Sequence, residues 1–94
     1  MDYSKLSDFE INRRVFSLVM NGRDWNRQGS EVFDFCNNPD DAWPIITCNR
    51  IGIVPGTTTD NWAAHHGDWN IAVADVNPLR AAMIIFLMMQ DSRK

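Results

Sequence analysis

The sequence lacks the features that mark several protein classes. It has no excess of basic charge, since its formal net charge is −3 over 94 residues, which weakens a general case for nucleic-acid binding. It has no long hydrophobic run, because its most apolar stretch, residues 81–89, is far shorter than the roughly 20 residues that cross a bilayer. Its five glycines are scattered, so no phosphate-binding loop is indicated. These absences leave a single domain, residues 1–94, with no indicated membrane segment or nucleotide site.

Cysteine is also scarce, with only Cys36 and Cys48 in the chain. The polar and acidic N-terminal sequence does not resemble a secretion signal. We therefore expect a cytosolic chain with two reduced, buried thiols and no disulfide.

The most informative pattern occurs twice. Residues 38–46 and 77–85 both fit Asn-Pro-x-x-Ala-x-x-Ile-Ile, and they start 39 residues apart. Asparagine before proline favours a helix start, because the amide oxygen accepts a hydrogen bond from the first turn and proline needs no donor there. The pattern predicts helices over residues 38–49 and 77–90, the first with a kink at Pro44. Two alternative explanations of the repeat are an old duplication and convergence on the same helix-start chemistry.

A third helix is predicted over residues 8–20. Ser7 and Glu10 have the spacing of a capping box, in which each residue bonds the backbone amide of the other. Arg13 and Arg14 are expected to face solvent. The apolar positions expected to form the buried face of this helix are Ile11, Val15, Leu18 and Val19.

Short alternating runs predict strands at residues 31–35 and 51–54 and a hairpin over residues 61–74. A two-residue turn at Gly67 and Asp68 would pair His66 with Trp69, Ala64 with Ile71 and Trp62 with Val73. One hairpin face is then bulky and apolar, and the other is small. The fold class expected is α+β, with about four mostly antiparallel strands packed by three helices. Helices on both faces of the sheet would make an α/β/α sandwich.

Three segments resemble one known family. MDYSKLSDFEIN, CNNPDDAWPIITCNRI and NPLRAAMIIFLMMQDS, in this order, are similar to the opening, central block and C-terminal helix of the NinX-like proteins of lambda-like phages and prophages. The segments cover nearly half of the chain, and residues 13–35 and 52–76 carry no match of this kind. The resemblance implies an accessory phage protein in the host cytoplasm. It implies no activity and no catalytic residues.

Arginine and tryptophan suggest a contact surface. The stretch from Arg23 through Trp25 to Arg27 combines the two residue types most enriched at interface hot spots, in a segment predicted as a loop. Packing of Trp25 against the first helix is the competing interpretation. Trp43 and one hairpin tryptophan are expected in the core. The full set of candidate partner-binding residues is Arg13, Arg14, Arg23, Trp25 and Arg27.

Catalysis and metal binding have weaker support. Cys36 precedes a predicted helix, whose N-terminus lowers a thiol pKa, but no histidine or acid stands at a spacing typical of a cysteine enzyme. His65 and His66 are adjacent, so on a strand they point to opposite faces and do not share a metal readily. Asp40 and Asp41 are better explained as first-turn acids that complement the helix dipole. We expect no catalytic residues, no metal and no cofactor.

The sequence therefore favours a non-enzymatic phage protein that binds a protein of the host or the phage. The first alternative is a weak single-stranded nucleic-acid or RNA-binding module that uses the arginines and Trp25. The second is a small enzyme that uses Cys36 or the histidine pair. No membrane partner is expected, and the oligomeric state is not indicated.

Overall fold

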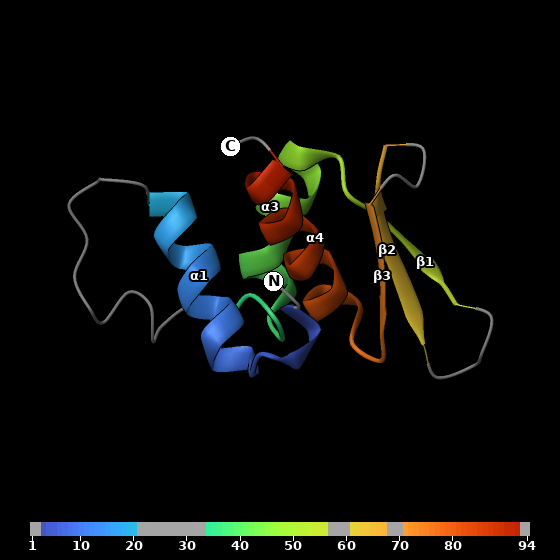
Figure 1. Ribbon diagram of the computed structural model, residues 1–94, viewed down its shortest axis with the longest axis horizontal. Helices are drawn as coiled ribbons and strands as arrows, with labels where there is room; N and C mark the ends of the chain where they lie inside the picture. Colours follow the sequence, from blue (N-terminus) through green and yellow to red (C-terminus); the bar gives the residue numbers. More distant parts are fainter. Residues whose placement is uncertain (1–2, 21–33, 57–60, 68–70, 93–94) are drawn as a thin grey trace.

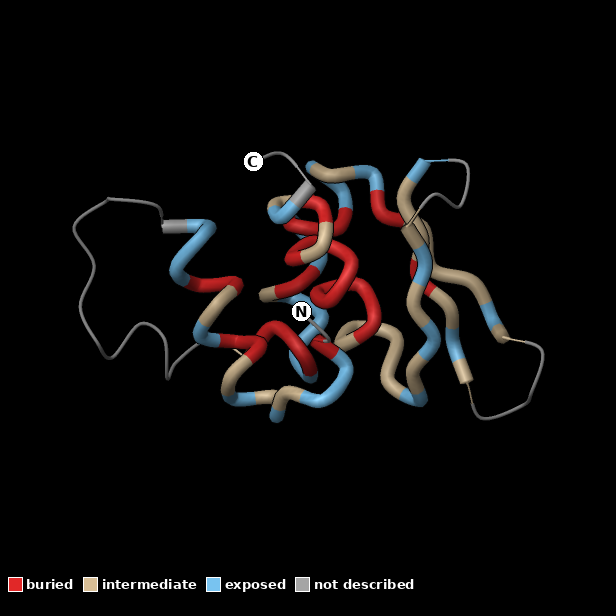
Figure 2. The backbone as a smooth tube through the Cα atoms, viewed as in Figure 1, coloured by how far each residue is buried: buried red, intermediate tan, exposed pale blue. Residues whose placement is uncertain are grey.

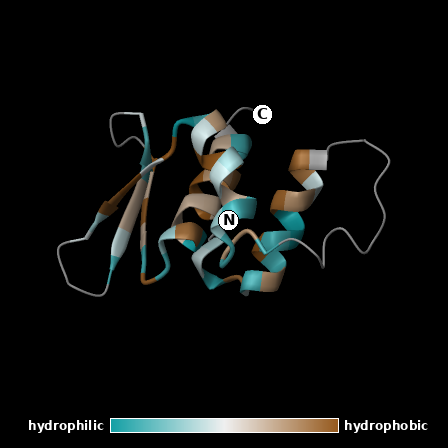
Figure 3. Ribbon diagram, turned by 180° about the vertical axis from the view of Figure 1, so that it is seen from behind, coloured by the Kyte–Doolittle hydropathy of each residue, from teal (hydrophilic) through white to brown (hydrophobic). Residues whose placement is uncertain are grey.

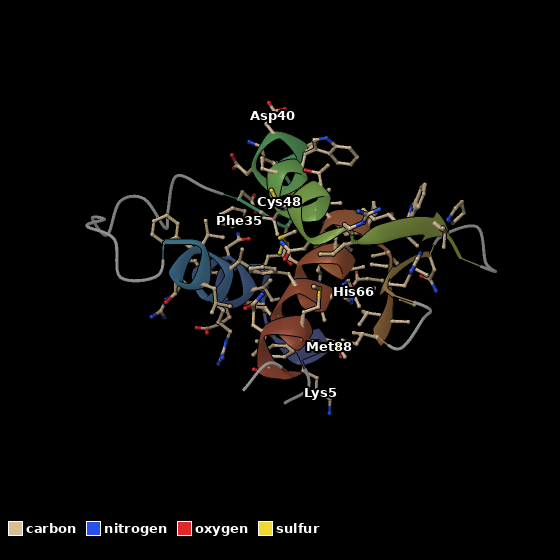
Figure 4. The ribbon with its side chains drawn as sticks, turned by 90° about the horizontal axis from the view of Figure 1, so that it is seen from above. Lys5, Phe35, Asp40, Cys48, His66 and Met88 are labelled. Carbon is tan, nitrogen blue, oxygen red and sulfur yellow. The ribbon has the colours of Figure 1, made fainter. Side chains whose placement is uncertain are left out.

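The architecture follows from one helix that is apolar on nearly all sides. The computed structural model describes residues 3–20, 34–56, 61–67 and 71–92. Helix α4 (Pro78–Ser92) lies between helix α1 (Asp8–Met20) on one side and the sheet on the other, as Figures 1 and 4 show. Helix α3 (Pro39–Asn49) and the short 3-10 helix η1 (Tyr3–Lys5) also pack on α4. Every residue from Ala81 to Leu87 is buried, so the middle of this helix is covered on all sides.

The helix-start signals act as the sequence predicts. The side chain of Asn38 accepts a hydrogen bond from the amide of Asp40, and that of Asn77 accepts from Leu79 at 3.0 Å. Ser7 Oγ accepts from the Glu10 amide at 3.2 Å at the start of α1. All three observed helices lie within two residues of their predicted bounds, and α3 continues through Pro44.

Helix α3 ends in a left-handed residue that is not glycine. Arg50 has φ 56° and ψ 46°, and its amide donates to the carbonyl of Thr47. The amide of Ile51 donates to Ile46 at 3.0 Å, which completes a Schellman cap. The chain then turns directly into the first strand.

The sheet has three strands among the described residues, and the fourth strand of the prediction is not among them. The strands β1 (Gly52–Pro55), β2 (Trp62–His66) and β3 (Ile71–Asp75) form an antiparallel meander in the order β1-β2-β3. The described helices lie on one side of this sheet (Figure 1), so the described part of the chain is α+β and does not form the α/β/α sandwich considered above. Of the strand predicted over residues 31–35, Asp34 and Phe35 are described, and they belong to a turn instead.

The hairpin register differs from the predicted one by two residues. His66 pairs with Ile71 and Ala64 with Val73, so the connection has four residues rather than two. A shift of two keeps every side chain on its predicted face, because side chains alternate with a period of two. Ile53, Ala64 and Val73 pack toward α4. The opposite face carries the small side chains of Gly52, Val54, Ala63, Ala72 and Ala74, with His65 among them.

Two apolar expectations are wrong. Trp43 is 59% exposed, because the buried stripe of α3 consists of Ala42, Ile45 and Ile46 and Trp43 lies outside it. Leu18 and Val19 are also exposed, since the last turn of α1 stands apart from the rest of the described structure (Figure 2). Figure 3 shows the same arrangement from behind, with hydrophobic residues at the exposed end of α1.

Candidate partner-binding site

A buried arginine fixes the N-terminal segment against α4. Arg80 is 13% exposed in its side chain and donates four hydrogen bonds. Nε donates to Asp75 at 3.1 Å and Nη1 to Asp8 at 2.6 Å. Nη2 donates to the carbonyls of Ser4 and Leu6 at 3.0 and 2.6 Å. Arg80 thereby holds η1 and the start of α1 in place beside α4.

Burial alone would lower the pKa of Arg80, but its hydrogen bond to Asp8 and the charges of Asp75 and Asp8 raise that pKa above its ordinary value. The guanidinium is thus charged at every physiological pH. It is a permanent link between the start of α1, the end of β3 and the start of α4.

Asparagines extend this polar contact to the turn before α3. Asn77 Nδ2 donates to the carbonyl of Cys36 at 2.6 Å and to Asn37 Oδ1 at 3.0 Å, so the two Asn-Pro helix starts lie side by side. Asn12, which is 8% exposed, donates to Asp34 Oδ1 at 2.9 Å and accepts from the amide of Cys36 at 3.1 Å. Two of these bonds satisfy the backbone amide and carbonyl of the buried Cys36.

The segment held in this way forms one wall of a cavity of about 380 Å³ between η1, α1 and the C-terminal half of α4. The cavity is mixed in character, with apolar side chains, cations, anions and neutral donors on its wall. The lining residues are Tyr3, Glu10, Arg13, Arg14, Ser17, Leu18, Leu87, Gln90 and Asp91. Its volume falls in the range of small-ligand and peptide-anchor pockets, roughly 300–1,000 Å³.

Tyr3 connects the two walls of this cavity. Its hydroxyl donates a short hydrogen bond to Asp91 Oδ2, which joins η1 to the end of α4. Burial and the neighbouring Asp91 carboxylate raise the pKa of Tyr3, and the nearby charge of Arg14 opposes that rise only in part. Tyr3 is therefore neutral at physiological pH, and its donor is used by Asp91.

The two arginines of α1 differ in their surroundings. Arg13 is exposed, pairs with Glu10 at 3.6 Å and lies over the ring of Phe9 at 6.0 Å from its centroid. Arg14 is half-buried and lines the cavity, which corrects the expectation that both face solvent. Its Nε is sealed from water and has no hydrogen-bond partner. Among the residues that the structure describes, no hydrogen bond or ion pair is formed by Arg14.

Exposed apolar side chains accompany the cavity-lining residues of α1, since Leu18 lines the cavity and the ring of Phe9 lies under Arg13. Phe9 is 57% exposed, and Leu18 and Val19 are exposed to a lesser degree. Exposed apolar groups beside arginine and tyrosine are typical of protein-contact surfaces. The sequence pattern assigned Leu18 and Val19 to the core and therefore missed this surface.

Three of the five predicted contact residues, Arg23, Trp25 and Arg27, lie outside the described residues. Arg13 and Arg14 are placed on the same helix and line the same cavity. The other lining residues were not predicted. Tyr3 and Asp91 are 88 positions apart and carry no shared sequence signal.

The alternative catalytic and metal candidates are dispersed. Cys36 is fully buried, and this burial, with the charge of Asp8, raises the pKa of its thiol to about 12, opposite to the activation that a helix start could supply. Cys48 is exposed on α3, which corrects its expected burial, and both thiols are free. His65 and His66 lie on opposite faces of β2. Within the described ranges, no three histidine, cysteine or acidic side chains gather to hold a metal.

The acidic residues near α3 have structural contacts. Asp41 accepts a hydrogen bond from the Asp34 amide at 3.0 Å, and Asp34 accepts from Asn37 at 3.2 Å. Asp40 and Asp41 stand in the first turn of α3, where the helix dipole favours negative charge.

A family model described as "Bacteriophage P22, NinX" matches residues 2–90. The chain therefore belongs to this NinX family of phage proteins, and the match extends through both stretches that lacked a segment resemblance. No curated protein and no solved structure matches the chain. No helix within the described ranges has the length and hydrophobicity needed to cross a membrane.

Proposed function

We propose that this phage protein is a non-enzymatic binding module that acts in the host cytoplasm on a protein of the host or the phage. The observation that carries the proposal is the cavity between α1 and α4, which exposed Leu18 lines and whose lining residue Arg13 lies over the exposed ring of Phe9. Apolar and arginine side chains around a preformed cavity are suited to anchor a partner's side chains.

The hydrogen bonds that hold the elements around the cavity support this proposal. Arg80 and Asn77 join four parts of the chain through hydrogen bonds, so the surface is fixed before a partner arrives. Preorganisation lowers the entropic cost of association. The low reactivity expected of a thiol with a pKa near 12 counts against an enzyme that uses Cys36.

The nucleic-acid alternative has less support from the described arginines. Arg13 is paired with Glu10, and Arg14 shares its cavity with Glu10 and Asp91. A phosphate backbone is bound best by unpaired basic groups on one surface. Salt-sensitive retention on a nucleic-acid column would favour this alternative.

The test is a tagged pull-down from bacterial host lysate, with and without nuclease, read by mass spectrometry. A variant with Phe9→Ser and Leu18→Ser is compared with wild type and with a Trp43→Ser control, whose exposed tryptophan lies on α3. We expect one protein to be enriched with or without nuclease, lost with the α1 variant and retained with the control. Enrichment only without nuclease would support the nucleic-acid alternative. Equal capture by all three proteins would place the contact away from α1.

A further inference from the structure

We infer that the cavity between α1 and α4 binds a carboxylate from an acidic peptide segment, with Arg14 as the residue that pairs with it. The inference rests on the proposed protein-binding function and names the chemistry of the partner. It starts from the guanidinium of Arg14, which lines the cavity and makes no hydrogen bond or ion pair with a described residue.

The other charged groups of the cavity already have partners. Glu10 pairs with Arg13 at 3.6 Å, and Asp91 accepts the hydrogen bond of Tyr3. Among the charged side chains that line the cavity, Arg14 is the one with no ion-pair or hydrogen-bond partner in the described part of the chain. A guanidinium presents its donors in a planar fork that matches a carboxylate.

The cavity also limits the kind of anion. Glu10 and Asp91 place negative charge on its wall, which disfavours a doubly charged phosphate more than a singly charged carboxylate. Leu18 and Leu87 provide apolar wall for the methylene groups of a glutamate side chain. The volume of about 380 Å³ exceeds one side chain, so a short peptide fits this space better than a lone ion.

The test uses defined probes and the intact protein. The tripeptide acetyl-Leu-Glu-Leu-amide, its glutamine counterpart and inorganic phosphate are titrated separately, and the Nε–Hε NMR signal of Arg14 is followed. That signal is assigned by its loss in Arg14→Gln. We expect saturable millimolar binding of the glutamate peptide, at least tenfold weaker binding of the glutamine peptide, and at least tenfold loss in Arg14→Gln. Arg13→Gln, the matched control on the same helix, should change the affinity less than threefold.

Equal binding of the glutamate and glutamine peptides would overturn the inference, and so would tighter saturation by phosphate or an unmoved Arg14 signal. The wild-type comparison of the two peptides holds even if Arg14→Gln fails to fold. If the peptide result fails while capture still depends on Phe9 and Leu18, only the carboxylate inference falls. If capture also fails, the proposed function falls with it.

Discussion

Replacing Arg80 with alanine should destabilise the protein more than any other single change to a charged residue in the described ranges. The substitution removes four hydrogen bonds and leaves Asp75, whose side chain is 17% exposed, with an uncompensated charge. It also frees η1 and the start of α1 from α4, because the carbonyls of Ser4 and Leu6 lose their shared donor.

The magnitude follows from burial. Breaking a buried ion pair by removing one partner costs about 3–5 kcal/mol. The side chain of Asp8 is 46% exposed and regains water, so its part of the loss is discounted by solvent screening. We therefore expect Arg80→Ala to lower the free energy of unfolding by about 3 kcal/mol, a large share of the roughly 5–15 kcal/mol available to a domain.

The assay is urea unfolding followed by far-UV circular dichroism, with Arg13→Ala as the control. The pair between Arg13 and Glu10 is 3.6 Å long and both side chains are well exposed, so its loss should cost less than about 0.5 kcal/mol. A double-mutant cycle of Arg80→Ala with Asp75→Asn should give a coupling of about 1–3 kcal/mol. A cost below about 1 kcal/mol for Arg80→Ala, or no coupling, would refute this account of the fold.

Four further predictions concern individual residues. Gly52→Ala should destabilise the protein by about 0.5–1 kcal/mol, since an added Cβ would lie 2.2 Å from Nε2 of His65 and force the ring aside. In a His65→Ala background the same change should be neutral or stabilising, because the clash is removed. Urea unfolding measures both effects. Arg50→Gly should stabilise by about 1 kcal/mol, because φ 56° is strained for arginine and free for glycine; an unchanged thermal midpoint would contradict this. A colorimetric thiol reagent at pH 8 should modify Cys48 alone, with Cys36 reacting only after denaturation. Burial raises the pKa of Cys36 from 9.0 to about 12. The stability that the neutral, buried thiol contributes is therefore fully present below pH 9 and is lost as the pH rises toward 12. Cys36→Ala should flatten the fall in the free energy of unfolding over that pH range.

The helix starts could be predicted because their chemistry is local. Asn38, Asn77 and Ser7 each bond an amide two or three residues ahead, and that contact requires only the first turn. The faces of the hairpin were also predictable, although the register was not. The predicted turn paired His66 with Trp69, whereas His66 pairs with Ile71, and alternation preserves the faces through this shift of two.

The candidate site could be predicted only in part. Arg13 and Arg14 were chosen for their charge, and the structure distinguishes them by burial and pairing. Arg80 carried a usable signal, because it is the only charged residue of α4 before Asp91, and a charge in a buried apolar stretch must find partners. Its partners at Asp8 and Ser4 lie more than 70 positions away, and no local pattern identifies them.

The sequence by itself determined where the three described α-helices start, the approximate positions of strands β1 to β3, and the family of the chain. The helix starts depend on hydrogen bonds within one turn, and the strands depend on the spacing of apolar residues. Both signals are local to a short segment of sequence. Only the tertiary structure decided that Cys36 is buried with a raised thiol pKa, that the side chains of Leu18 and Phe9 are exposed, and that Tyr3 meets Asp91 beside a cavity. The reason is that burial and pairing depend on which distant segment packs against a residue, and α4 brings those segments together.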